Sequence, residues 1–176
     1  PEVMLSHSFY KSHTKEFYDF YFDKMIYKDA KPNDAHLSLA KLEDKGKLKA
    51  VITQNIDGLH QMAGSKNVLE LHGSVHRNYS TKCGVFYDLD YLLKLKGGMP
   101  TLEHCGGGVK PDVVLYEEGL NDETVENSVE FIKNADTLII GGTSLAVYPA
   151  AGLIRYFKGE NLVLLNNTAT NSDSGA

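Results

Sequence analysis

Residues 48–60 read LKAVITQNIDGLH, and this stretch decides the class of fold. The run 48–53 is short, apolar and rich in β-branched residues, which predicts a buried strand. Gln54, Asn55 and Asp57 follow directly at the carboxyl end of that strand. In an open parallel sheet, ligands bind beyond the carboxyl ends of the strands, so this polar loop is a candidate binding site.

Strands and helices alternate through the rest of the chain. Further short apolar runs predict strands within 67–73, 135–144 and 161–167. Amphipathic patterns with start and stop signals predict helices over 121–134 and 148–159. This alternation predicts an α/β fold built on a parallel sheet.

Two other segments do not fit the alternation. The first 45 residues carry aromatic side chains at helical spacing, which indicates helices packed in a core. Residues 77–110 contain glycine clusters, and we expect them to be irregular and without a core of their own. The prediction is a smaller module made of about 1–45 and 77–110, inserted into a sheet part made of about 46–76 and 111–170.

The bulk composition excludes several classes of protein. The 176 residues carry a net charge of -5, so no basic surplus is available to neutralise the phosphates of a nucleic acid. The sequence contains no apolar run long enough to cross a membrane. Two cysteines can form at most one disulfide, so the chain is not a disulfide scaffold, and we expect a protein of the reducing cytoplasm.

Two more strand ends carry polar groups suited to a nucleotide. Gly142, Thr143 and Ser144 join a strand to a helix, where small residues and hydroxyls let a ribose or phosphate approach the backbone. Asn166 ends the last strand. These residue types also occur in ordinary turns and strand ends, so both interpretations stay open.

Two single residues have chemistry of their own. His72 ends a strand just before a glycine and is either a structural residue or a general base that titrates near neutral pH. Cys83 is a possible nucleophile, but no activating arrangement around it makes that role specific.

Four motifs together resemble the sirtuin family of NAD-dependent protein-lysine deacylases, of the bacterial type. They are TQNIDGLHQMAGS (53–65), LELHGSVHR (69–77), KPDVVLYEE (110–118) and GGTSLAVYPAAGL (141–153), in the family's order and spacing. The resemblance implies a Rossmann-like parallel sheet with a smaller module that is helical in one part and similar to a zinc ribbon in the other. It also implies NAD as the cofactor and acylated protein lysines as the substrate.

The resemblance assigns roles near the nicotinamide end of NAD. Gln54, Asn55 and Asp57 match the residues that bind and orient the nicotinamide ribose. His72 matches the catalytic base, which takes a proton from a ribose hydroxyl. The implied reaction removes an acyl group, with acetyl as the expected one, and yields nicotinamide and O-acyl-ADP-ribose.

The other assigned roles concern the rest of NAD and the peptide. The residues that match the adenosine and phosphate contacts are Gly142, Thr143, Ser144, Asn166 and Asn167. The backbone around Val113 and Val114 matches the segment that pairs with an extended substrate peptide, and Tyr116 stands at a position that is usually aromatic. Val75 is a candidate wall of the acyl-lysine channel.

The sequence departs from the family pattern at its start. Sirtuins open with a strand and the motifs GAGxS and GIPDFR, and neither motif occurs here. That strand normally lies inside the sheet, and its neighbours lose their ladder partners without it. We therefore expect the chain as given to be inactive by itself.

A second departure concerns metal. The family pattern has two C-x-x-C pairs that bind zinc, whereas Cys83 and Cys105 remain here with Ser80 and Leu102 in the partner positions. His104 adjoins Cys105, and we expect the two neighbouring side chains to diverge. Structural zinc needs four ligands, so we expect this module to keep its outline without zinc.

Two alternative functions stay open beside deacylation. A non-catalytic relative would bind NAD or an acylated peptide without turnover, and an ADP-ribosyltransferase would use the same NAD contacts with another acceptor. The acyl preference, the protein substrates and the oligomeric state are not determined by the sequence.

Overall fold

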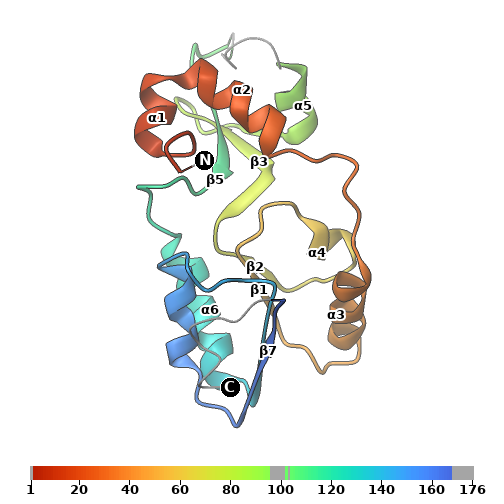
Figure 1. The fold of residues 1–176 in the computed structure, drawn as a ribbon. Coiled ribbons are helices and arrows are strands. Elements are labelled where there is room, and N and C mark those ends of the chain that lie inside the picture. Colours follow the sequence, from red (N-terminus) through yellow and green to blue (C-terminus); the bar gives the residue numbers. More distant parts are fainter. Residues whose placement is uncertain (1, 96–101, 103, 168–176) are drawn as a thin grey trace. The chain divides into compact units, whose positions relative to one another are not determined.

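The computed structural model describes residues 2–95, 102 and 104–167 (Figure 1). The chain divides into two compact units, Pro1–Gly119 and Leu120–Ala176, which are described separately below.

The first unit contains five helices and five strands in its described part. The helices are α1 (His7–Ser12), α2 (Thr14–Lys24), α3 (Asp34–Asp44), α4 (Leu59–Met62) and α5 (Leu89–Lys94). The strands are β1 (Val51–Thr53), β2 (Val68–Glu70), β3 (Gly73–Ser80), β4 (Phe86–Asp88) and β5 (Val109–Val113).

The predicted parallel pairing is present in this unit. Strands β1 and β2 pair in parallel, with Val51 opposite Val68 and Thr53 opposite Glu70. The helix α3 between the aromatic helices and β1 begins at the N-cap Asn33, whose side chain accepts from the backbone of His36 in a capping box.

The prediction that residues 77–110 are irregular is wrong. Strands β3, β4 and β5 form an antiparallel sheet in the order β4-β3-β5. The strand β3 pairs with β5 from Gly73 opposite Val113 to Ser80 opposite Val109. These partners lie about 30 to 40 residues apart, and such pairing leaves only a weak local pattern in the sequence.

The core of the first unit is aromatic. Phe17 and Tyr21 on α2 are 0% exposed, which confirms that the aromatic residues of this helix are core residues. In Figure 1, α1 and α2 lie beside β3 and β5, and the Tyr18 hydroxyl donates to the Val109 carbonyl of β5. The predicted smaller module and the predicted sheet part both contribute residues to this one cluster. Its members are Tyr10, Phe17, Tyr18, Tyr21, Phe22, Val75, Leu89, Leu92, Leu102, Val109, Val113 and Leu115. The division into a smaller module of about 1–45 and 77–110 and a separate sheet part stays a prediction.

The second unit is a short α/β element. Its parts are α6 (Asp122–Asn134), β6 (Thr137–Gly141), the 3-10 helix η1 (Ala150–Tyr156) and β7 (Asn161–Leu165). Strands β6 and β7 pair in parallel from Thr137 opposite Asn161 to Gly141 opposite Leu165. The predicted helix within 148–159 is therefore present, as a 3-10 helix. Together with β1 and β2, these strands confirm the α/β class with parallel sheets.

Candidate functional site

The loop that follows β1 is held in one conformation by its own side chains. The Thr53 hydroxyl accepts from the backbone N–H of Asn55 at 3.0 Å, and the Asp57 carboxylate accepts from the N–H of Leu59 at 2.9 Å. Gly58 has a φ of +71°, and a Cβ there would lie 2.9 Å from the ring of His76. Glycine is therefore required at the turn that presents Asp57.

His72 lies directly beyond β2, and its ring is oriented by this loop. Its Nδ1 lies 3.0 Å from the backbone carbonyl oxygen of Gln54. A carbonyl oxygen only accepts hydrogen bonds, so Nδ1 carries the proton. In the neutral imidazole the lone pair then lies on Nε2, which is the form that accepts a proton from a substrate.

The backbone on either side of His72 is also fixed. The carbonyl of His72 accepts from the N–H of Val114 at 3.0 Å. Gly73 has a φ of +73°, and a Cβ there would collide with the carbonyl of Asp112. Glycine after His72 is thus required by the close approach of β3 and β5.

Arg77 on β3 forms ion pairs with one residue on β2 and one on β5. The Nε of Arg77 donates to Asp112 at 2.7 Å, and its Nη1 donates to Glu70 at 2.7 Å. Burial works against the charged guanidinium, but the hydrogen bonds to Asp112 and Glu70 raise the pKa of Arg77 overall. This ion-paired group joins β2, β3 and β5 next to the candidate base.

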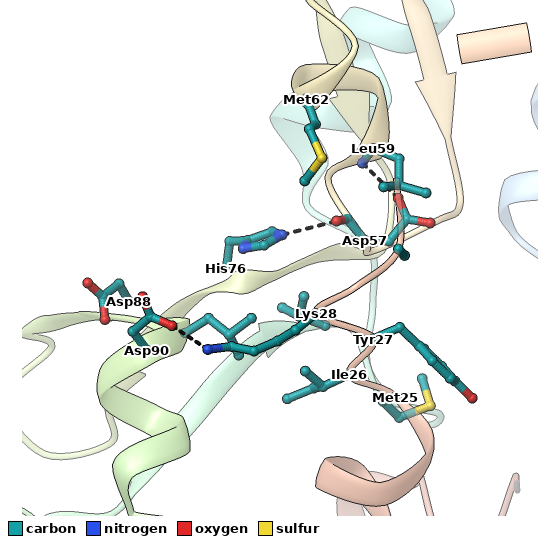
Figure 2. Close-up of a pocket in the computed structure, with 13 residues that line it drawn as sticks. Met25, Ile26, Tyr27, Lys28, Asp57, Leu59, Met62, His76, Asp88 and Asp90 are labelled. Atoms are coloured by element: carbon teal, nitrogen blue, oxygen red, sulfur yellow. Dashed lines mark hydrogen bonds and ion pairs between the residues drawn. The ribbon is translucent and has the colours of Figure 1, made fainter. Parts of the chain in front are cut away.

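A cavity of about 450 Å³ lies beside the loop after β1. Figure 2 shows Asp57 and His76 on one side of it and the residues after α2 on the other, among them Lys28, which pairs with Asp90 at 2.6 Å. The Nε2 of His76 lies 3.0 Å from the carbonyl oxygen of Asp57. Val75, the candidate wall of an acyl-lysine channel, also lines this cavity. Asp57, predicted to bind the ribose, and Val75, predicted to line the acyl-lysine channel, therefore line the same cavity.

The segment predicted to pair with a peptide already uses part of its backbone. Val113 is buried in β5, and its carbonyl accepts from the ammonium group of Lys110 at 3.2 Å. Tyr116 is exposed, and its backbone bonds to the N-terminal segment through Leu5 and His7. The side chain of Tyr116 is therefore presented to solvent by a fixed backbone.

Glu118 fixes the turn after this segment. Its carboxylate accepts from the N–H of Leu115 at 2.9 Å, from His7 at 2.7 Å and from Lys110 at 3.2 Å. Burial raises the pKa of Glu118, but these hydrogen bonds and the charge of Lys110 outweigh it and lower the pKa. Glu117 has a φ of 76°, and its carboxylate accepts from the backbone and hydroxyl of Ser8.

In the second unit the predicted nucleotide residues gather at one end of the sheet. The N–H of Gly142 donates to the carbonyl of Leu165 at 3.0 Å, and the side chain of Asn166 donates to the carbonyl of Thr143 at 3.1 Å. Gly142 has a φ of +63°, and a Cβ at this position would meet no atom within 4 Å. Ser144 and Asn167 are exposed at the same end. The loop offers hydroxyls, amides and open backbone, which fits a ribose or a phosphate.

The cysteines and their neighbours form a cluster that contradicts one expectation. The Sγ of Cys83 lies 3.3 Å from the Nε2 of His104 and 3.6 Å from the Sγ of Cys105. The expectation that His104 and Cys105 diverge is wrong, because the turn after Leu102 brings both side chains to Cys83. The Ser80 hydroxyl completes the group at 3.5 Å from the Sγ of Cys105. Two thiols, an imidazole and a hydroxyl fit a tetrahedral metal ion such as zinc.

The cluster changes the acidity of one thiol. The hydrogen bond with the Ser80 side chain, followed by those with the Val85 backbone and His104, lowers the pKa of Cys83 to about 6. Cys83 is exposed. The lowered pKa favours the thiolate of Cys83, the form that binds metals and reacts with electrophiles.

Sequence reasoning missed one residue of these sites, His76, and rejected another, His104. His76 holds the carbonyl of Asp57 and lines the cavity, and its only sequence signal is a second histidine four residues after His72. His104 joins the cysteine cluster, and its signal is its place beside Cys105. Of the residues predicted in the first unit, Gln54 and Val114 contact His72, whereas Asp57 and Val75 line the cavity. Those predicted in the second unit lie at the ends of β6 and β7.

None of the helices in the described part of the chain has the length and apolar character needed to cross a membrane.

Comparison with known proteins places these features in a family. The model of the Sir2 family matches residues 1–149. The chain is 66% identical over 176 residues to an NAD-dependent protein deacetylase of Clostridium acetobutylicum, a match that covers 100% of this chain and 72% of that protein. It is 64% identical over 176 residues to an NAD-dependent protein deacetylase of Clostridium tetani, a match that covers 100% of this chain and 71% of that protein.

Solved structures agree with the sequence relatives. A structure described as a Sir2–p53 peptide–NAD+ complex is 40% identical, with a TM-score of 0.89 over 97% of this chain and 73% of that chain. A structure of Sir2 bound to an acetylated peptide is 39% identical, with a TM-score of 0.89 over 97% of this chain and 74% of that chain. The α/β fold, the four motifs and these matches lead to one conclusion: this chain belongs to the Sir2 family.

Proposed function

We propose that this protein is an NAD-dependent protein-lysine deacetylase in which His72 is the general base. Its relatives at 62–66% identity are named NAD-dependent protein deacetylases. One similar structure holds 2'-O-acetyl-ADP-ribose and a deacetylated peptide, which are the products expected of such a reaction.

The hydrogen bond between His72 and Gln54 is the observation that carries this proposal. It places the proton on Nδ1 and leaves Nε2 able to accept another. The ring is held from the loop after β1, whose residues Asn55 and Asp57 are the proposed contacts of the nicotinamide ribose. A base whose ring is held by the ribose-binding loop, with Nε2 left unbound to it, suits the removal of a proton from a ribose hydroxyl.

NAD, when bound, supplies an activated ribose carbon from which nicotinamide departs. We assign Gln54, Asn55 and Asp57 to the nicotinamide ribose, because they form the ordered loop beside the cavity. Its adenosine and phosphates are assigned to Gly142, Thr143, Ser144, Asn166 and Asn167. The open backbone at Gly142 and the exposed hydroxyl of Ser144 support that assignment.

The acylated lysine is assigned to the surface around β5. Val113 and Val114 are proposed to pair with the extended peptide, and Tyr116 to contact it through its exposed ring. The cavity lined by Val75 and Asp57 has apolar walls suited to an acyl chain.

The net charge of -5 supports the proposal that nucleic acid is not a partner. The small number of cysteines supports a cytoplasmic location. Loss of peptide deacetylation on addition of duplex DNA at low salt would argue against the first of these two proposals.

Release of nicotinamide from NAD, measured with and without an acetyl-lysine peptide, tests the reaction. Release that requires the peptide, with O-acetyl-ADP-ribose formed, is the expected result. Peptide-independent release with ADP-ribose transferred to protein would replace the proposal by ADP-ribosyltransfer. Tight NAD binding without any release would identify a non-catalytic binder.

The variant His72→Ala tests the role of the base. We expect kcat to fall about 100-fold or more, with little change in the affinity for NAD measured by calorimetry. His13→Ala, at an exposed histidine between α1 and α2, is the control and should keep normal kcat. Equal kcat in both variants would remove His72 from the mechanism.

A further inference from the structure

The strand β3 is interrupted by a bulge next to the cavity. Ser74 lies opposite Asp112 and Asn78 lies opposite Pro111, so two adjacent residues of β5 face positions 74 and 78 of β3. Residues 75–77 are the extra residues between these two pairs, and they are called the β3 bulge below. Bulges re-aim side chains and occur often beside active sites. The β3 bulge is therefore a candidate functional device.

The β3 bulge contacts the loop that follows β1. The backbone N–H of Val75 donates to the carbonyl of Ile56 at 3.0 Å. The Nε2 of His76 lies 3.0 Å from the carbonyl oxygen of Asp57, as Figure 2 shows, and it is the donor because a carbonyl oxygen only accepts. Val75 and His76 both line the cavity. The bulge thus carries one wall of the proposed acyl channel and holds two carbonyls of the proposed ribose-binding loop.

Arg77, the last residue of the bulge, binds two carboxylates from two other strands. Its guanidinium donates to Glu70 on β2 and to Asp112 on β5, at 2.7 Å in each case. Glu70 also accepts from the side chain of Gln61 on α4 at 2.9 Å. The side chain of Glu70 is only 9% exposed, so its charge depends on these donors. A planar guanidinium can hold two carboxylates in fixed directions, whereas the ammonium group of a lysine is a single point charge.

The two ion pairs of Arg77 enclose the part of the chain that carries the reaction. The pair with Glu70 closes the segment 70–77 on itself, and this segment contains both His72 and the β3 bulge. The pair with Asp112 fixes the residue of β5 whose carbonyl lies against Gly73. Without the guanidinium, the bulge would keep its hydrogen bonds to the loop after β1 but lose its ion pairs to β2 and β5.

We propose that Arg77 is a positioning residue that determines which acyl groups the channel admits. Its two ion pairs hold the β3 bulge, and the bulge in turn fixes Val75 as a wall of the channel and His76 against the loop that carries Asp57. Arg77 itself touches no substrate and acts through these neighbours. The inference rests on the proposed deacetylase function, because it concerns the acyl group of that reaction.

Hydrogen exchange read by mass spectrometry tests whether Arg77 fixes the bulge. In Arg77→Gln, we expect exchange in peptides that cover residues 73–78 to rise about tenfold or more, with no change in peptides from α6. Arg155→Gln, at an exposed arginine of η1, is the matched control and should exchange like the unmodified protein. Unchanged exchange at 73–78, or a rise spread evenly over the first unit, would overturn the proposal.

The acyl preference tests the effect on the channel. The measurement is the ratio of kcat/KM for a butyryl-lysine peptide to that for an acetyl-lysine peptide of the same sequence. Arg77→Gln should raise this ratio about threefold or more, because a wall that is no longer fixed admits the larger group more readily. A variant that is merely less stable loses activity toward both peptides equally, so its ratio does not change. An unchanged ratio in Arg77→Gln would overturn the proposal.

Arg77→Lys is the second variant and keeps a cation beside both carboxylates, so it guards against a protein that fails to fold. One ammonium group cannot reproduce the directions of a guanidinium, so the ratio should move the same way by a smaller factor. A ratio equal to that of the unmodified protein would show that charge alone is enough, and it would contradict the bridge between the two carboxylates.

The two measurements separate this inference from the proposed function. Hydrogen exchange needs no turnover, so it decides whether Arg77 fixes the β3 bulge even in a protein that deacylates neither peptide. Lack of turnover in the unmodified protein would refute the deacetylase activity and, with it, the effect on acyl groups.

Discussion

The aromatic core of the first unit and the parallel strand pair of the second are both rich in apolar residues, but they bury them very differently. Phe17 and Tyr21 on α2 are 0% exposed. In the second unit, Ile139 on β6 is 46% exposed and Leu165 on β7 is 60% exposed. Neither of these two five-residue strands contains a buried residue.

The difference shows that apolar composition does not by itself measure stabilisation. A side chain contributes in proportion to the apolar area that folding removes from water. The rings of α2 also contact one another, with Phe17 stacked on Tyr21 at 5.7 Å between centroids. Buried residues on α6, such as Ile132, are the counterpart in the second unit.

Phe17→Ala should have the largest effect. Removing a fully buried ring costs about 3 to 5 kcal/mol of unfolding free energy, because a cavity remains where the ring contacts are lost. Hydrogen exchange read by mass spectrometry should rise in peptides from the first unit and stay unchanged in those from α6. Phe17→Leu, which keeps most of the volume, is the control and should cost clearly less.

Gly73→Ala should lower the free energy of unfolding by about 3 kcal/mol, for a reason unrelated to buried apolar area. The positive φ is strained for alanine, and the added methyl would collide with the carbonyl of Asp112. Chemical denaturation measures the loss. Gly46 also has a positive φ, +67°, but a Cβ at this position would meet no atom within 4 Å. The variant Gly46→Ala therefore measures the backbone strain without the collision. Equal losses in the two variants would contradict the collision at Gly73.

Glu118→Gln should cost about 1 to 2 kcal/mol at pH 7 through lost charge-assisted hydrogen bonds. Because the folded pKa of Glu118 is lowered, its contribution is complete above the ordinary value of 4.5 and is lost as pH falls through the lowered pKa. Denaturation curves from pH 7 down to acid should therefore show the two proteins converging in stability. Glu126→Gln, at an exposed glutamate on α6, should show no such convergence. A difference for Glu118→Gln that is constant with pH would contradict the ionic origin.

Ile139→Ala should have the smallest effect, under about 1 kcal/mol, because almost half of the side chain is already in water. Ile132→Ala in the same unit is the matched comparison and should cost about 2 to 4 kcal/mol. Thermal unfolding of both variants measures the contrast. Equal losses at the two positions would mean that β6 is covered in solution.

Local signals in the sequence predict most of the elements. Asn121 is the predicted start of the helix over 121–134, and it is the N-cap of α6, with its side chain accepting from Thr124. The strand endings at Thr53, Gly141 and Leu165 also lie where the apolar runs stop. These features depend on contacts between residues a few positions apart, which the sequence states directly.

The antiparallel sheet and the cysteine cluster cannot be predicted in this way. Glycine and proline between 77 and 110 indicate turns, while the strands β3 and β5 find each other only across the intervening chain. The position of His104 depends on the turn that closes between Leu102 and Gly107. Neither contact has a local signature.

The sequence by itself determined the family, the α/β class and the candidate base His72, because motif order, hydrophobic period and capping residues are local properties of the chain. The tertiary structure alone decided which nitrogen of His72 is free and that Asp57 meets His76. It also decided that His104 turns toward Cys83 rather than away from it. The physical reason is that these contacts follow from strand register and core packing, which join residues whose separation along the chain carries no information about their distance in space.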